Sequence, residues 1–285
     1  MIKQIQTGSI PYRKIFGLFF GSCALILNLY SFYLHSAIDF TTPTTQASIA
    51  TLTWILSIIF FGVSIFILFP SKKTKNGKDE SLSLIEKILL VGILISGLIL
   101  RIYKLNHLGI QLDEWYWLTN AKGILDGVIR SPFGFIGDQP SNMPAYTVAF
   151  FLAIFKNSYL AVRIPGVLYS LLNIILVFAF LKEAFNKKVA LLAVFLISFS
   201  IWDIHMSQWG WNNVNLNPFL ISGTLFFLYK GIKNVSFKHI FFCGIFLGVS
   251  LNLLYIAALS TISVAFYFAY QYLINTDKKK FYIYS

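Results

Sequence analysis

The sequence MPAYTVAFFLAIF, at residues 143–155, determines how the chain is predicted to cross the membrane, because it is strongly apolar yet too short to be a span. A membrane-crossing helix needs about 20 mostly apolar residues. Longer apolar runs lie on both sides of residues 143–155, and each is predicted to be a span. These runs cover about 15–34, 51–69, 85–103, 165–182, 189–206, 214–230, 239–256 and 258–274. The sequence therefore predicts an all-α integral membrane protein, a polytopic helical bundle of about eight spans.

Lysines in the short loops between these runs determine the predicted threading, because cytoplasmic loops carry an excess of Lys and Arg. With the N-terminus in the cytoplasm, four groups of lysines fall on that side. They are Lys72, Lys73, Lys75, Lys78 and Lys87; Lys182, Lys187 and Lys188; Lys230, Lys233 and Lys238; and Lys278, Lys279 and Lys280. If residues 143–155 formed a full span, every later group would fall outside. We therefore expect a multi-pass plasma-membrane protein in which residues 143–155 lie at the interface or re-enter, within a non-cytoplasmic segment over about 104–163.

The composition agrees with a membrane protein and argues against a nucleic-acid partner. Hydrophobic residues make up 57% of the chain and charged residues 12%, about half the usual charged share of a soluble domain. The net charge of +12 comes mainly from loop lysines, so we expect membrane lipids and no nucleic acid as partners. Residues 1–80 are predicted to form a two-span hairpin with a basic cytoplasmic loop, and residues 81–285 the transmembrane core.

The pair Asp113-Glu114 is the strongest candidate for chemistry, and an amphipathic juxtamembrane helix is predicted to begin there, over 114–126. Carboxylates suit a helix start for structural reasons alone, since they accept unpaired backbone N–H groups and complement the helix dipole. As a functional site, Asp113 would be a general base or a metal ligand facing a sugar donor. Both interpretations stay open on the residues alone.

Three further candidates, Arg130, Asp138 and Arg163, lie in the same long segment. Arg163 stands at the outer start of a span, where its fork of N–H donors could bind a phosphate. Its alternative role is to extend toward the lipid headgroups, as arginines at helix ends commonly do.

A second outer loop supplies His205, Gln208 and Asn217. His205 is a lone histidine at a span end, which is more often a hydrogen-bonded boundary residue than a catalyst. Asn217 followed by Pro218 predicts the start of a helix, with Asn217 as the capping residue.

The order of these features resembles the GT-C glycosyltransferases, and most closely the branch of protein O-mannosyltransferases, aminoarabinose transferases and Rgt-like enzymes. In that branch a first core span ends in an Asp-Glu pair followed by an aromatic-rich juxtamembrane helix, as at Leu112-Asp113-Glu114-Trp115-Tyr116. Similar later segments are Asp138-Gln139-Pro140, Arg163-Ile164-Pro165, Lys187-Lys188-Val189-Ala190 and residues 201–208. The resemblance covers about residues 84–273 and matches only the N-terminal part of such an enzyme.

The resemblance implies transfer of a sugar from a polyprenyl-phosphate donor to a lipid, glycan or protein acceptor on the non-cytoplasmic face. It makes Asp113 the catalytic carboxylate, with Glu114 supporting it or helping to hold a divalent cation, the one cofactor considered. It assigns Arg130 and Arg163 to neutralising the leaving phosphate. The remaining substrate contacts that it implies are Asp138, His205, Gln208 and Asn217.

Three departures from the family pattern keep alternatives open. Gln139 stands where relatives usually have Lys, Asn217 where they often have Asp, and the chain stops after about six core spans. These departures favour a catalytically inactive membrane subunit or fragment, completed by a second chain. A transporter of lipid-linked intermediates is the other alternative, but it predicts ionisable residues near the middle of the spans and broken helices at the bilayer midplane, whereas the predicted spans carry almost no charge near their middle.

Overall fold

The computed structural model describes residues 12–36, 45–68, 81–106, 109–132, 141–253, 261–262 and 264–266. Within these ranges the chain forms ten labelled α-helices and no β-strand, which confirms the predicted all-α class. The chain divides into two units. The first is built from residues 1–38 and 44–73, and the second contains the rest of the chain.

The first unit is a hairpin of α1 (Tyr12–Ser36) and α2 (Thr45–Leu68). Small polar side chains join the two helices along their length. The Ser31 hydroxyl donates to the Ala50 carbonyl at 2.7 Å, and the Ser64 hydroxyl donates to the Gly17 carbonyl at 2.7 Å. These bonds satisfy hydroxyls inside an apolar helix pair, where an unpaired polar group would be costly.

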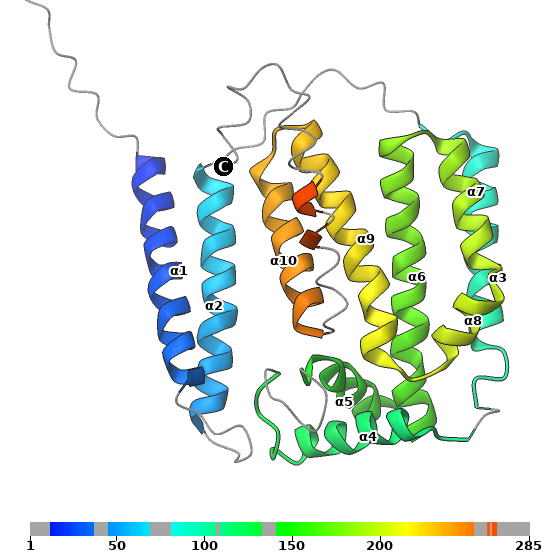
Figure 1. The fold of residues 1–285 in the computed structure, drawn as a ribbon, viewed down its shortest axis with the longest axis horizontal. Coiled ribbons are helices and arrows are strands. Elements are labelled where there is room, and N and C mark those ends of the chain that lie inside the picture. Colours follow the sequence, from blue (N-terminus) through cyan, green and yellow to red (C-terminus); the bar gives the residue numbers. More distant parts are fainter. Residues whose placement is uncertain are drawn as a thin grey trace, which may run out of the picture. The chain divides into compact units, whose positions relative to one another are not determined.

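The second unit is a bundle of helices that run side by side, with α8 set at an angle to them (Figure 1). Its bundle helices are α3 (Leu84–Ile102), α6 (Ser158–Ala184), α7 (Lys187–Ser198), α8 (Ile201–Gln208), α9 (Asn212–Lys233) and α10 (Phe237–Leu253). The turns between α6 and α7 and between α9 and α10 lie at one end of this bundle (Figure 1). Those turns carry the lysines that the sequence predicts to face the cytoplasm, including Lys187 and Lys233.

Two shorter helices, α4 (Leu112–Leu125) and α5 (Met143–Phe155), lie across the opposite end of the bundle (Figure 1). They pack on α6 through a small apolar core that includes Trp117, Ala121, Val148 and Val162, all almost fully buried. At 13 residues α5 is about 20 Å long, too short to cross a bilayer. The position of α4 and α5 at the end away from the α6–α7 and α9–α10 turns agrees with the predicted threading.

The predicted count of about eight spans is not confirmed. Three helices of the described chain are long and apolar enough to cross a membrane, namely α1, α2 and α6, and a fourth crossing results if α7 and α8 count as one. Helix α3 is apolar but carries three charges, Glu86, Lys87 and Arg101, and α9 begins in a run rich in asparagine. Most of the span predicted over 258–274 lies outside the described residues.

The span predicted over 189–206 is broken into two helices. Helix α7 ends at Ser198, α8 begins at Ile201, and the two are bent by 57°. The break has a local cause, because the Ser200 side chain accepts the Asp203 N–H and caps a new helix.

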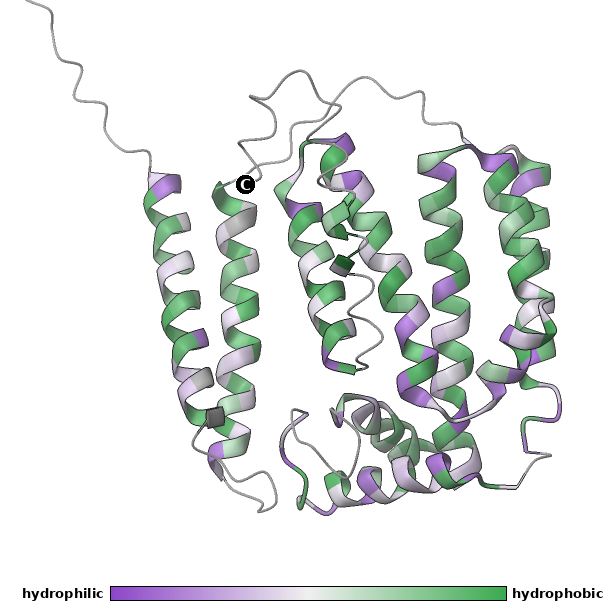
Figure 2. Cartoon of the chain, in the orientation of Figure 1, coloured by the Kyte–Doolittle hydropathy of each residue, from purple (hydrophilic) through white to green (hydrophobic). Residues whose placement is uncertain are grey.

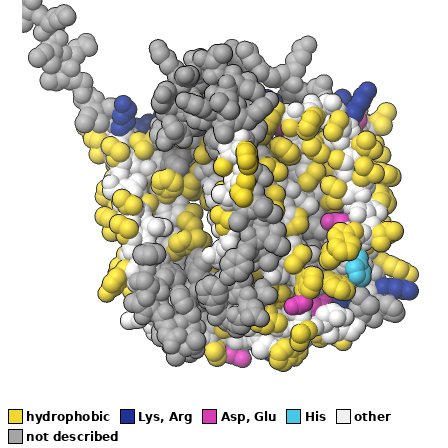
Figure 3. Space-filling model, in the orientation of Figure 1, with side chains coloured by type: hydrophobic (Ala, Val, Ile, Leu, Met, Phe, Trp, Pro, Cys, Tyr) yellow, Lys and Arg dark blue, Asp and Glu magenta, His cyan; other side chains and the backbone are white. Residues whose placement is uncertain are grey.

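Hydrophobic residues dominate the bundle helices, whereas hydrophilic residues concentrate in α4, in α8 and in the parts of α6 and α9 nearest them (Figure 2). In the space-filling view, hydrophobic side chains cover much of the visible face, and acidic side chains show toward its lower half (Figure 3). Apart from the charged residues at the lysine-bearing end, hydrophilic residues of the second unit lie near the end formed by α4 and α5.

Candidate functional site

The Asp113-Glu114 pair occupies the first turn of α4, as the sequence predicts. Gln111 is the capping residue of this helix, and its backbone N–H donates to Glu114 Oε2 at 2.9 Å. Glu114 therefore satisfies one of the backbone donors that a helix start leaves unpaired. The sequence suggested that a carboxylate would accept a backbone N–H at this helix start, and Glu114 is the residue that does so.

Glu114 forms a two-pronged ion pair with Arg163 of α6. Arg163 Nε lies 2.6 Å from Glu114 Oε1, and one terminal nitrogen lies 2.8 Å from Glu114 Oε2. The side chain of each residue is only 1% exposed. Arg163 also donates to the carbonyls of Leu105 at 2.5 Å and Gly109 at 2.9 Å, so it binds the segment between α3 and α4 as well.

Gly210 brings the start of α9 into the same contact. Its N–H donates to Glu114 Oε1 at 3.0 Å. A Cβ at Gly210 would lie 2.7 Å from Val162 Cγ2 and 2.9 Å from Glu114 Cγ, so only glycine allows this approach. Asn212 adds a link by donating from its amide to the Val162 carbonyl at 3.0 Å. Helices α4, α6 and α9 are thereby joined around one carboxylate.

The charge of Glu114 is stabilised by these donors. Burial alone would raise its pKa, but the hydrogen bonds from Arg163, Gln111 and Gly210 outweigh burial and hold the pKa below its ordinary value. A depressed folded-state pKa contributes stability that is present above the ordinary pKa and lost as the pH falls through the folded one. Glu114 is therefore ionised at neutral pH.

Asp113 differs from its neighbour because it remains partly exposed. One of its carboxylate oxygens, Oδ2, accepts a hydrogen bond from the indole Nε1 of Trp211, the capping residue of α9. Trp211 packs edge-on against Trp209, whose ring centroid lies 5.0 Å from that of His205. The open carboxylate thus lies beside an aromatic row that continues to His205 on α8.

Two other predicted substrate contacts, Arg130 and Gln208, form hydrogen bonds to backbone carbonyls. Arg130 is exposed and follows the far end of α4, which ends at Leu125, about 18 Å along the helix axis from Asp113; its Nε donates to the Gly127 carbonyl. The Gln208 amide donates to the carbonyls of Leu100 at 3.1 Å and Tyr103 at 3.0 Å, and thereby caps the end of α3.

Asn217 lies inside α9, not at its start, so the predicted capping role is wrong. The helix begins at Asn212, because the preceding Gly210 and Trp211 are held against α4. The Asn217 side chain accepts a hydrogen bond from Ser250 of α10 at 2.6 Å. Asp138, the remaining predicted contact, lies outside the described residues.

A second buried ion pair escaped the sequence analysis. Arg101 of α3 is fully buried and pairs with Asp203 of α8, and Ser170 of α6 bonds to both partners. The Arg101 guanidinium also donates to the carbonyls of Gly97 at 2.9 Å and Ser198 at 3.0 Å. The signal was present in the sequence, because Arg101 and Asp203 each lie near one end of an apolar run, where a buried charge implies a partner.

The donor set does not fit a divalent cation held jointly by Asp113 and Glu114. Each Glu114 oxygen already accepts two hydrogen bonds, and the Arg163 charge lies directly against it. Across the described ranges, no group of three or more His, Cys, Asp or Glu side chains is placed to hold a metal ion.

One protein-family model matches the chain. It is described as dolichyl-phosphate-mannose-protein mannosyltransferase and covers residues 138–284, just over half of the 285 residues. The matched range contains Arg163, Asp203 and Gly210, and it begins after the Asp113-Glu114 pair. No curated protein and no solved structure matches the chain. The chain therefore belongs to the dolichyl-phosphate-mannose-protein mannosyltransferase family, a multi-pass membrane family of GT-C glycosyltransferases that use a lipid-linked sugar donor.

Proposed function

We propose that this chain transfers a glycosyl group from a polyprenyl-phosphate sugar to a hydroxyl group on the non-cytoplasmic face of the membrane, with Asp113 as the catalytic carboxylate. The observation that carries this proposal is the contrast within the pair. Glu114 is sealed by four hydrogen bonds, whereas Asp113 is partly exposed and is held by one indole N–H. A carboxylate that is both fixed and accessible can accept a proton from a bound hydroxyl.

The reaction is a substitution at the anomeric carbon of the donor sugar. The acceptor hydroxyl oxygen forms the new bond to that carbon while the bond from the carbon to the phosphate oxygen breaks. The hydroxyl proton passes to Asp113, and the electron pair of the broken bond leaves with polyprenyl phosphate. Attack from the face opposite the phosphate inverts the anomeric centre, as the resemblance to GT-C enzymes implies.

We propose that Glu114 and Arg163 contribute to this reaction by holding the start of α4, and with it Asp113, in place. Four of the five Arg163 N–H groups are directed to Glu114 and to the carbonyls of Leu105 and Gly109. We therefore assign Arg163 to fixing the start of α4, in place of binding the leaving phosphate. Arg130 follows the far end of α4 and donates to the Gly127 carbonyl, so we give it no part in the proposed step, and that step requires no divalent cation.

The proposed orientation in the membrane rests on the lysines at one end of the second unit. Its lysine-bearing turns lie opposite α4 and α5 (Figure 1), and lysines favour the cytoplasmic side. This supports a site at the outer surface, and we keep the cytoplasmic N-terminus as a prediction from the sequence. Mannose is the first sugar to test, because the matching family is described as using dolichyl-phosphate mannose.

The experiment measures transfer from radiolabelled polyprenyl-phosphate sugars, mannose first, into the lipids, glycans and proteins of membranes that hold the full chain. Asp113→Asn removes the proton acceptor and keeps the shape of the side chain, so transfer should fall at least about 100-fold. The matched control is Asp126→Asn, which changes an exposed aspartate at the other end of α4 and should leave transfer unchanged.

Equal transfer by wild type and Asp113→Asn would remove Asp113 from the reaction. No transfer from any donor by folded wild-type protein would instead favour the inactive-subunit alternative. Folding is checked for each variant by gel filtration in detergent.

A further inference from the structure

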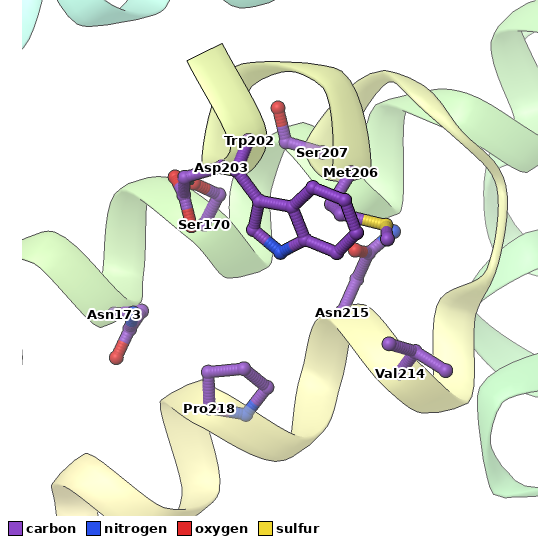
Figure 4. Close-up of a pocket in the computed structure, with 9 residues that line it drawn as sticks. All are labelled: Ser170, Asn173, Trp202, Asp203, Met206, Ser207, Val214, Asn215 and Pro218. Atoms are coloured by element: carbon purple, nitrogen blue, oxygen red, sulfur yellow. Dashed lines mark hydrogen bonds between the residues drawn. The ribbon is translucent and has the colours of Figure 1, made fainter. Parts of the chain in front are cut away.

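A cavity of about 280 Å³ lies between α6, α8 and α9, in the part of the second unit next to the start of α9. Figure 4 shows the Trp202 indole lying across this space, with Asp203 and Ser170 on one side and Met206 and Asn215 on the other. Its remaining lining residues are Asn173, Ser207, Val214 and Pro218. Specific ligand pockets usually measure about 300–1,000 Å³, so this one has room for a single small ring.

The polar groups in the wall are mainly hydrogen-bond acceptors. Asp203 uses Oδ2 for Arg101 and Ser170, and Oδ1 has no partner among the described residues. Asn215 uses its amide N–H on the Trp209 carbonyl at 2.7 Å, which leaves its side-chain oxygen. Pro218 has no N–H to offer the Val214 carbonyl, the acceptor one turn earlier in α9. Such a wall suits a ligand that donates hydrogen bonds.

Asn173 supplies a hydrogen-bond donor in the same wall. Its oxygen accepts the Ser222 hydroxyl at 2.7 Å, so its amide N–H groups are the part left to face a ligand. A hydroxyl group both donates and accepts, and several hydroxyls around one ring could therefore meet Asn173, Asp203 and Asn215 together.

The charge of Asp203 is balanced by Arg101, and this balance decides the charge of the ligand. Arg101 is fully buried while the Asp203 side chain is 28% exposed, so the pair presents a carboxylate whose charge is already neutralised. A cation would meet the Arg101 charge behind that carboxylate, and an anion would meet the carboxylate itself. A neutral, hydroxyl-bearing ligand avoids both penalties.

A buried ion pair is a poor source of stability, because desolvation of the two charges offsets their attraction. Three helices nevertheless contribute groups to this one, α3 through Arg101, α6 through Ser170 and α8 through Asp203. The arrangement holds a carboxylate in a mostly apolar wall, beside the broad face of Trp202. Sugars present C–H groups on one face and hydroxyls at the edge, which is the complement of such a wall.

We infer that this cavity binds one neutral monosaccharide ring, with its C–H face on Trp202 and its hydroxyls on Asp203, Asn173 and Asn215. The inference rests on the proposed function for the source of the sugar, which is either the donor or a glycan acceptor. It adds to that function the residues that recognise the sugar.

The test measures protection of a new thiol in the cavity. In the full chain with Met206→Cys, in a detergent without sugar, alkylation of the new thiol by a maleimide is followed by peptide mass spectrometry, which separates it from Cys23 and Cys243. Methyl α-D-mannopyranoside should slow alkylation in a saturable manner, whereas cyclohexanol at the same concentration should not. Asn215→Ala should weaken this protection about tenfold, the effect of one lost hydrogen bond.

Thr119→Cys, on the exposed surface of α4, is the control and should show no protection. Asp113→Asn should leave protection intact, which separates a failure of this inference from a failure of the proposed reaction. If Met206→Cys does not fold, saturation-transfer NMR of the same mannoside with the unmodified chain replaces it.

Absence of mannoside binding to folded protein, or equal protection by cyclohexanol, would overturn the inference. Where binding is present, a transfer assay identifies its source. Asn215→Ala raises KM for the lipid-linked donor if the ring belongs to the donor, and raises KM for the glycan if it belongs to the acceptor.

Discussion

The two buried arginine–carboxylate pairs of the second unit differ in how far they are closed. Arg163 and Glu114 are each 1% exposed, and both Glu114 oxygens are fully occupied. Arg101 is equally buried, but Asp203 is 28% exposed and keeps one oxygen for a ligand. The closed pair fixes the backbone segments that it contacts. The half-open pair also leaves a carboxylate oxygen of Asp203 at the cavity, where it can accept a hydrogen bond from a ligand.

Breaking the closed pair should have the largest effect on stability. Arg163→Ala leaves the Glu114 charge buried without a partner, which costs about 3–5 kcal/mol. We expect the variant to unfold on detergent extraction or to show a large fall in Tm, measured by thermal unfolding of the purified full chain. The double variant Glu114→Gln with Arg163→Gln removes both charges and should recover part of the loss. A single variant as stable as wild type would contradict the structural role of the closed pair.

Breaking the half-open pair should cost less. In Arg101→Met the Asp203 carboxylate can still turn toward water, so we expect a loss of about 1–3 kcal/mol in the free energy of unfolding. The same thermal assay applies, and Asp203→Asn in the Arg101→Met background should reduce the loss. A larger loss of stability in Arg101→Met than in Arg163→Ala would show that the half-open pair contributes more to the fold than the closed pair.

The seal around Glu114 can be tested without altering a charge. Gly210→Ala places a methyl group 2.7 Å from Val162 Cγ2 and 2.9 Å from Glu114 Cγ, which should destabilise the fold by about 1–3 kcal/mol. Gly92→Ala is the matched control, because a Cβ there meets nothing within 4 Å and alanine favours the interior of α3 by up to about 1 kcal/mol. A lower Tm for Gly92→Ala than for Gly210→Ala would show that the start of α9 does not pack against Glu114 of α4.

The bond from Trp211 to Asp113 concerns activity and should have the smallest effect on the fold. Trp211→Phe keeps an aromatic ring beside Trp209 and removes the indole N–H that orients the carboxylate. We expect kcat for transfer to fall about tenfold with little change in KM, equivalent to one lost hydrogen bond. Trp115→Phe, on the exposed face of α4, should change neither constant. A change in KM alone would assign Trp211 to binding substrate.

Much of the arrangement of the second unit could be predicted from charge and length. The lysines and the short run at residues 143–155 predicted that this run would not be an ordinary span, and α5 is a short helix lying beside α4. The Asp113-Glu114 pair was correctly placed at a helix start, because the preference of carboxylates for that position is local. These predictions depended on residues close together in the sequence and on the excess of Lys and Arg in cytoplasmic loops.

The contacts between distant segments could not be predicted in the same way. Arg163 pairs with Glu114 across 49 positions and Arg101 with Asp203 across 102, so each pairing depends on which helices are neighbours. Asn217 was misplaced because Gly210 and Trp211 start α9 earlier through contacts with α4. The break between α7 and α8 did have a local signal, since Ser200 is a good capping residue inside an apolar run.

The two adjacent carboxylates have different proposed roles: Asp113 accepts the proton of the acceptor hydroxyl, and Glu114 holds α4, α6 and α9 together. The most direct test is the transfer rate per folded molecule of Asp113→Asn, measured beside its Tm. We predict a rate at least about 100-fold below wild type with an unchanged Tm. A normal rate, or a rate that falls only in proportion to lost folded protein, would contradict the claim.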